Sequence, residues 1–151
     1  MPFDAGGLEI LGDDECLALL QTTPVGRIVF THQALPAVQP VNYAMDGRDV
    51  IIRTSPGSKL AAAARSAVVA FEIDSYDAER RTGWSVVLVG QARRVTDPEE
   101  AAELGALDLW PWVPGGREEF IRISPRLCSG RRILRSPAPA GRTGRAGSPS
   151  G

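Results

Sequence analysis

The stretch VGRIVFTHQALPAVQPVNYAMDGRDVIIRT, residues 25–54, predicts the fold, because it contains three extended segments joined by short polar turns. Residues 25–31 alternate Gly26, Ile28 and Phe30 with a second set of side chains, which is the period of a β-strand. Residues 36–45 and 50–54 are the next strands, and Asp46-Gly47 between them is a strong hairpin signal. Three successive strands with tight turns predict an antiparallel meander.

Outward from this stretch, further strands and short helices follow. We expect strands at 67–74, at 84–96 with a bend or bulge at Gly90, and as two final strands, 118–124 and 127–134, around Ser124-Pro125. Helices are expected at 11–21, 60–65 and 97–107, capped by Asp13, Ser58 and Asp97 in that order. The class is therefore mainly β (α+β), with six or seven antiparallel strands. Strands of this number and length usually close into a barrel, and a β-sandwich is the alternative.

The chain divides into an N-terminal arm (1–12), one domain (13–135) and a tail (136–151) without apolar periodicity, which we expect to be disordered. The net charge of −1 and the lack of a basic stripe argue against nucleic acid, and no apolar run is long enough for a membrane helix. A cytoplasmic protein is the default expectation. One histidine, His32, and two distant cysteines, Cys16 and Cys128, predict no metal site.

Lys59 is the single lysine of a chain whose other basic residues are arginines, and it lies at a predicted helix start. A cation is unfavourable there by a few tenths of a kcal/mol, roughly, unless an anion binds. Arg53, Thr54, Ser55 and Ser58 precede it, and together with free helix N–H groups they would suit a phosphate. A solvated lysine at an ordinary helix start is the alternative.

Pro40 lies within the second strand, where it cannot donate a ladder hydrogen bond. This position predicts an edge, a bulge or a face turned toward a ligand, and Asn42 and Tyr43 lie beside it. A plain edge-strand proline is the alternative.

In this order, Pro-Val-Asn-Tyr (40–43), Arg-Thr-x3-Ser-Lys (53–59), Gly-Trp-Ser-Val (83–86) and Gly-Arg-Arg-Ile (130–133) resemble the pyridoxamine 5'-phosphate oxidase-like family. The resemblance covers roughly Asp13 to Leu134 and is greatest to the nitroimidazole-resistance-type branch. It implies a split β-barrel that binds flavin mononucleotide (FMN) at a homodimer interface. A small organic substrate would exchange hydride or electrons with the flavin. No protein general acid is evident in the sequence, and Tyr43 and solvent are the candidates for a proton donor.

The resemblance also implies roles for particular residues. Residues of the cluster at 53–59 would hold the flavin phosphate, the strand Pro40, Val41, Asn42 and Tyr43 would lie along the ring, and Ser85 with its neighbour Trp84 would approach the ring or ribityl chain. Trp110 and Trp112 would cover the ring or lie in the core or interface.

The chain lacks the C-terminal Arg-Leu-His-type segment of true pyridoxamine phosphate oxidases, so that activity is not expected. A deazaflavin (coenzyme F420) reductase and a non-catalytic flavin- or haem-binding module are the alternatives. Neither the substrate nor a catalytic residue follows from the sequence.

Overall fold

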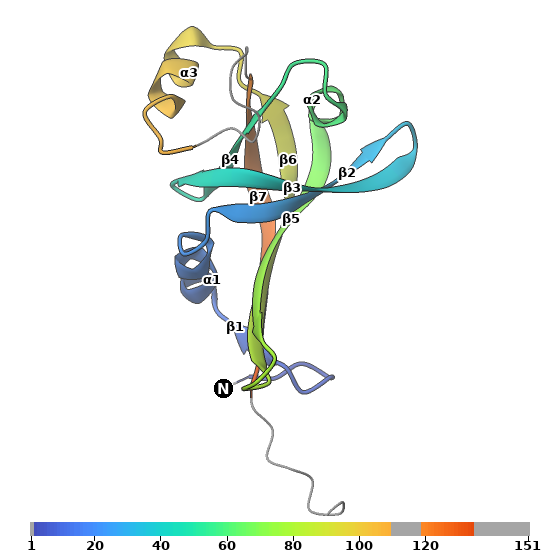
Figure 1. Cartoon of the computed structure of the whole chain (residues 1–151), viewed down its shortest axis with the longest axis vertical. Helices are drawn as coiled ribbons and strands as arrows, with labels where there is room; N and C mark the ends of the chain where they lie inside the picture. Colours follow the sequence, from blue (N-terminus) through green and yellow to red (C-terminus); the bar gives the residue numbers. More distant parts are fainter. Residues whose placement is uncertain (1, 110–118, 135–151) are drawn as a thin grey trace, which may run out of the picture.

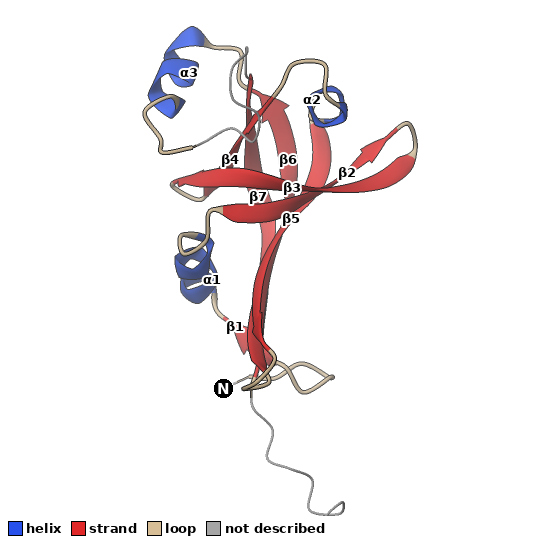
Figure 2. Ribbon diagram, in the orientation of Figure 1, coloured by secondary structure: helices blue, strands red, loops and turns tan. Residues whose placement is uncertain are grey.

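The computed structural model describes residues 2–109 and 119–134. In this part of the chain, seven strands and three short helices are present (Figures 1 and 2). In chain order they are β1 (Glu9–Leu11), α1 (Asp13–Leu20), β2 (Val25–His32), β3 (Leu35–Asp46), β4 (Asp49–Thr54), α2 (Lys59–Ala63), β5 (Ala67–Asp77), β6 (Thr82–Arg94), α3 (Pro98–Leu104) and β7 (Glu119–Ile133).

All strand pairings are antiparallel, in the order β1-β7-β4-β3-β2-β5-β6, and β6 also pairs with β7. That last pairing closes six strands into a barrel, because β6 and β7 are otherwise separated by the rest of the sheet. The prediction of a mainly β, antiparallel barrel with short flanking helices is thus confirmed. In Figure 1, β5, β6 and β7 extend below the barrel as a ribbon, with β1 alongside.

Strand β7 is continuous, and the prediction of two strands around Ser124-Pro125 is wrong. A register shift between Val89 and Gly90 accommodates that dipeptide within the ladder, so the proline does not end the strand. A Cβ at Gly90 would lie 2.1 Å from the carbonyl oxygen of Ser124, which requires glycine there. The bend or bulge predicted at Gly90 is confirmed as a register shift of the ladder, with the extra residue on the β7 side.

The barrel is split along β7. In β7, the residues from Glu119 to Ile123 pair with Thr54 to Val50 of β4. Further along the same strand, Gly130 to Arg132 pair with β1. Residues 124–129 therefore have β6 on one side and no described strand on the other. Helix α1 packs against β7 beside this opening.

Local signals account for most helix boundaries. Ser58 caps α2 and Asp97 caps α3 by accepting hydrogen bonds from the N–H groups of Ala61 and Glu100, as predicted. Helix α1 is capped by Gly12 without a side-chain hydrogen bond, so the assignment of Asp13 as its cap is wrong. The expected arm contains β1, which the sequence analysis missed because a three-residue strand is too short to show a period.

Two clusters of buried apolar side chains hold the fold together. The first fills the barrel, with Ile28, Val50, Phe71 and Leu88 among its fully or almost fully buried members. The second lies on the outer face of β4, where Ile51 packs against Leu104 of α3 and Leu109. Alternation along β4 supplies both clusters, because successive residues of a strand point to opposite faces.

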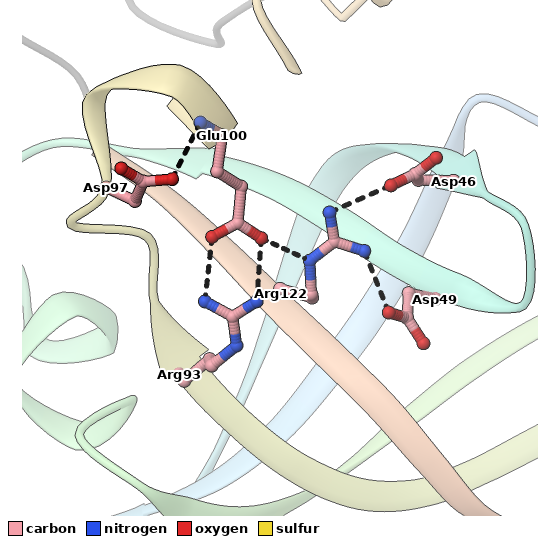
Figure 3. A network of polar contacts seen from close by, with 6 residues as sticks. All are labelled: Asp46, Asp49, Arg93, Asp97, Glu100 and Arg122. Atoms are coloured by element: carbon pink, nitrogen blue, oxygen red, sulfur yellow. Dashed lines mark hydrogen bonds and ion pairs between the residues drawn. The ribbon is translucent and has the colours of Figure 1, made fainter. Parts of the chain in front are cut away.

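A polar network fixes α3 to the barrel (Figure 3). Arg122 of β7 contacts Asp46, Asp49 and Glu100, at 2.8, 2.8 and 2.9 Å. Glu100 also receives two hydrogen bonds from Arg93, at 2.6 and 2.9 Å. One guanidinium thereby joins the β3–β4 turn, α3 and β7.

Candidate functional site

The predicted phosphate segment lies between the end of β4 and the start of α2. Thr54 and Ser58 are joined by a hydrogen bond of 3.0 Å between their hydroxyl oxygens, and the Ser58 hydroxyl also accepts from the N–H of Ala61. Ser55 and Lys59 are exposed beside them. Within the described residues, the Lys59 ammonium has no ion-pair partner, so it is available to an anionic ligand.

Arg53 lies on the other face of β4. Its Nη1 donates to the carbonyl oxygen of Leu109 at 2.9 Å, and its guanidinium lies over the ring of Phe120, 5.1 Å from the centroid. Thr54 instead points toward α2, because neighbouring residues of a strand point to opposite sides. The expected convergence of Arg53 with the hydroxyls of Thr54 and Ser58 is therefore not present in this protomer.

The segment Pro40–Tyr43 alternates between the core and the outer surface. Val41 and Tyr43 are buried in the barrel, where the Tyr43 hydroxyl donates to the carbonyl oxygen of Leu20 and its ring meets Phe71 edge-on at 4.8 Å. Burial raises the pKa of Tyr43 to about 12. The suggestion that Tyr43 donates a proton to substrate is wrong, because its hydroxyl is committed inside the core.

Pro40 and Asn42 occupy the outward positions of the same segment. Pro40 lies opposite Arg27 of β2, while β4 pairs with β3 only from Tyr43 onward. Residues 35–42 are thus paired on one side only within the described fold, which confirms the edge interpretation of Pro40.

A charged cluster lies next to Pro40 on the outer face, and the sequence analysis missed it. Arg27 Nη1 is 3.2 Å from both Glu72 Oε1 and Asp74 Oδ2 on β5. Burial, and then the neighbouring Asp74, raises the pKa of Glu72 to about 7. The sequence contained a signal for this cluster: Glu72 and Asp74 are two positions apart in the predicted strand 67–74, so both side chains must lie on the same face.

Ser85 belongs to the same outer face. It lies opposite Asp74 in the β5–β6 ladder, so Pro40, Arg27, Asp74 and Ser85 lie across four adjacent strands. Three strand spacings separate β3 from β6, or roughly 14 Å. The structure therefore brings the Pro40 segment and Ser85 onto one surface.

An apolar row crosses this surface beside the charged cluster. Its members are aligned by register across five strands: Val38, Val29, Ala70, Val89 and Leu127. The two ends, Val38 and Leu127, are 63% and 67% exposed. An exposed apolar row of this kind is typical of a contact surface.

Trp84 points away from this surface and packs against the barrel core. It lines a cavity of about 260 Å³ near the turn that joins β5 and β6, whereas Tyr43 lines another, of about 420 Å³, beside Leu20 and Asp108. Ala67 of β5 lies close to α2, and Asp74 of the same strand lies opposite Ser85. These two residues are seven positions apart, which corresponds to roughly 23 Å along the strand. Within one protomer, Lys59 and the Trp84–Ser85 pair thus lie far apart.

The remaining expectations concern residues outside the described part of the chain, metal binding and membrane helices. Trp110, Trp112 and the tail 136–151 lie outside the described residues. In the described portion, no group of three or more His, Cys, Asp or Glu side chains could hold a metal ion. None of its helices has the length and apolar character needed to cross a membrane.

Comparison with known proteins identifies the family. The family described as pyridoxamine 5'-phosphate oxidase matches residues 12–132, and the chain belongs to it. An uncharacterized protein of Mycobacterium tuberculosis, Rv0080, is 45% identical over 130 residues, which cover 82% of this chain and 84% of that protein.

Solved structures agree with this assignment. An FAD binding protein from Mycobacterium smegmatis has a TM-score of 0.75 and 37% identity, covering 85% of this chain and all of that one (100%). An FAD-binding protein from Mesorhizobium loti has a TM-score of 0.68 and 25% identity, covering 83% of this chain and 98% of the other. A candidate 5-nitroimidazole antibiotic resistance protein from Bacteroides thetaiotaomicron has the same fold, with a TM-score of 0.64 at 12% identity over 87% and 95% of the two chains.

Proposed function

We propose that this chain binds a flavin nucleotide between two copies of itself and serves as an oxidoreductase for a small organic substrate. The observation that carries the proposal is its 37% identity to an FAD binding protein along the whole of that protein. The resemblance favours FMN and this relative favours FAD. Both share the riboflavin phosphate to which the residues described above would bind.

The residues fit such a group in two parts. Lys59 and Ser55 are exposed at the start of α2, where an ammonium and a hydroxyl would bind a phosphate. Pro40 and Asn42 line an open strand edge on the outer face, where backbone groups could orient a flat ring. When bound, the flavin supplies the two-electron chemistry, and the protein supplies its position and electrostatic surroundings.

The separation of the candidate residues supports a homodimer. Lys59 and Ser85 are far apart in one protomer, so two copies facing each other would complete the site by contributing different parts. The apolar row from Val38 to Leu127 would be the contact surface, because its exposed side chains have no described partner element.

Cofactor release and rebinding test the proposal. The purified protein is denatured and the supernatant is separated with FAD, FMN and coenzyme F420 as standards, and the stripped protein is then titrated with each. We expect flavin in the supernatant and saturable quenching of flavin fluorescence. Release or binding of F420 alone would favour the deazaflavin alternative, and binding of none of the three would overturn the proposal.

Lys59→Ala tests the phosphate contact. Loss of one charge-assisted hydrogen bond should weaken flavin affinity roughly 10- to 100-fold. The same change should leave the stability of the cofactor-free protein unchanged or raise it slightly, because a cation at a helix start is unfavourable. Arg65→Ala, which removes an exposed cation just beyond α2, is the matched control and should leave the affinity unchanged.

Sedimentation tests the dimer. Val38→Asp should shift the protein toward monomer and lower flavin affinity together, because a charge would be buried in the contact. Tyr76→Asp, at another exposed large side chain near the β5–β6 turn, is the control and should remain dimeric. Turnover of quinones or nitroaromatics by the reduced protein would distinguish an oxidoreductase from a flavin-binding module.

A further inference from the structure

The two cysteines, which come from opposite ends of the chain, meet between α1 and β7. A Cβ at Gly130 would lie 2.6 Å from the sulfur of Cys16, so this thiol rests directly on the Gly130 backbone. Cys128 is two residues before Gly130 and therefore projects from the same face of β7. The two thiols are close enough for each to shift the pKa of the other.

The bulge in β7 makes this meeting possible. Ile121 and Ile123 point into the barrel, and strict alternation would then turn Cys128 outward. Gly90 pairs with Pro125 and Val89 with Leu127, so one residue of β7 is left over and the alternation is inverted beyond it. Leu127 is consequently exposed, and Cys128 faces α1.

The two thiols differ in access. Cys16 is completely buried in the core cluster, whereas Cys128 is half-buried and lines a cavity of about 490 Å³. The cavity lies at the split of the barrel, where β7 has left β4 and not yet reached β1. Leu17, Arg48 and Arg126 also line it. A small molecule can therefore approach the Cys128 sulfur, while Cys16, which is 0% exposed, cannot be approached directly.

We propose that Cys16 and Cys128 form a reversible redox pair, oxidised to an intramolecular disulfide by a small disulfide that enters this cavity. The Cys128 thiolate attacks one sulfur of the small disulfide and expels the other as a thiolate. The Cys16 thiolate then attacks the Cys128 sulfur and expels the second thiolate. The protein loses two electrons and two protons, and the small disulfide becomes two thiols.

The surroundings of the pair set the rate of this exchange. Burial raises the pKa of both thiols, that of Cys128 to about 12. Asp13 raises both further, whereas Arg48 lowers the pKa of Cys128 and Arg131 that of Cys16. Glu15 adds to the increase at Cys16. Since only the thiolate attacks, exchange is slow near neutral pH and accelerates about tenfold for each pH unit below these pKa values.

Closure would fix α1 to β7 covalently. Helix α1 also contacts β3, because the carbonyl oxygen of Leu20 accepts a hydrogen bond from the Tyr43 hydroxyl. The disulfide would close nearly the whole domain into one loop, which restricts the unfolded chain strongly. The pair requires no flavin, so its test is independent of the proposed function.

Mass spectrometry of the full-length native protein tests the pair. The protein is equilibrated at pH 8.5 with 2-hydroxyethyl disulfide and 2-mercaptoethanol at graded ratios, quenched with acid and alkylated. We expect two alkylatable thiols to be lost together and a peptide link between Cys16 and Cys128. The melting temperature should rise by roughly 5–15 °C, and 2-mercaptoethanol alone should reverse the change.

Single variants test the order of attack. Cys16→Ser should stop at a mixed disulfide on Cys128, whereas Cys128→Ser should not react while folded, because Cys16 is inaccessible. Cys16→Ala and Cys128→Ala replace either variant that fails to fold. Two thiols that stay free at the most oxidising ratio, a mixed disulfide that persists on native Cys128, or a link between chains would overturn the proposal.

Discussion

Arg122 on β7 and Glu100 on α3 form a half-buried ion pair, with 2.9 Å between Nε and Oε2 (Figure 3). The same guanidinium contacts Asp46 and Asp49, so its removal would leave three carboxylates with fewer partners. The Arg122 side chain is only 12% exposed, and such a pair is costly to break from one side. This network holds α3, and with it the Leu109 carbonyl that Arg53 contacts, against β4.

Arg122→Met should therefore lower the free energy of unfolding by about 2–4 kcal/mol. Urea denaturation of the cofactor-free protein measures this value. Arg80→Met is the control, since Arg80 and Asp77 form a far more exposed pair at 3.7 Å, and it should cost less than about 0.5 kcal/mol. Equal effects of the two substitutions would show that the network does not support the fold.

Glu72→Gln should change how stability depends on pH. The folded pKa of about 7 lies above the ordinary value of 4.5, so the folded state binds more protons between these values. The contribution of Glu72 to the free energy of unfolding is therefore fully present below about pH 4.5 and is lost as the pH rises toward 7.

The free energy of unfolding of Glu72→Gln, relative to that of the wild type, should therefore increase by about 1 kcal/mol from pH 5 to pH 8, after allowance for solvent screening. Melting curves at both pH values provide the measurement. A constant stability difference across this range would contradict the assignment.

Gly26→Ala should destabilise the barrel by about 1–3 kcal/mol. A Cβ at Gly26 would lie 2.2 Å from Cζ of Phe71, a fully buried ring that also packs against Tyr43. The ring cannot move without disturbing the core. Gly105→Ala is the control, because Gly105 is exposed with a φ of −63° that alanine adopts readily, and a Cβ there would meet only ordinary contacts of 3.4 and 3.5 Å. Thermal unfolding distinguishes the two variants.

Tyr43→Phe should cost about 1 kcal/mol in unfolding free energy, because the buried carbonyl oxygen of Leu20 loses its donor. Flavin affinity should remain unchanged, since the hydroxyl faces the core and not the outer surface. A large loss of affinity without a loss of stability would instead place the hydroxyl in the cofactor site.

Much of the fold could be predicted from local patterns. Alternation and the Asp46-Gly47 turn predicted the meander, and the caps at Ser58 and Asp97 were visible as short polar signals. These features depend on interactions within a few residues, so the sequence contains them directly. The break expected at Ser124-Pro125 failed because β7 continues through the dipeptide with one extra residue opposite the Val89–Gly90 step of β6. That pairing involves a strand distant in sequence, so the residues around Ser124 alone do not reveal it.

The sequence by itself determined which residues are chemically suited to a site, among them Lys59, Pro40 and Ser85. Only the tertiary structure decided which of them meet: pairing across four strands aligned Pro40 with Ser85, and alternation turned Arg53 away from Thr54. It also brought Cys16 to Cys128, through an inverted face of β7. Such contacts depend on strand register, because a shift of one residue moves every side chain to the opposite face.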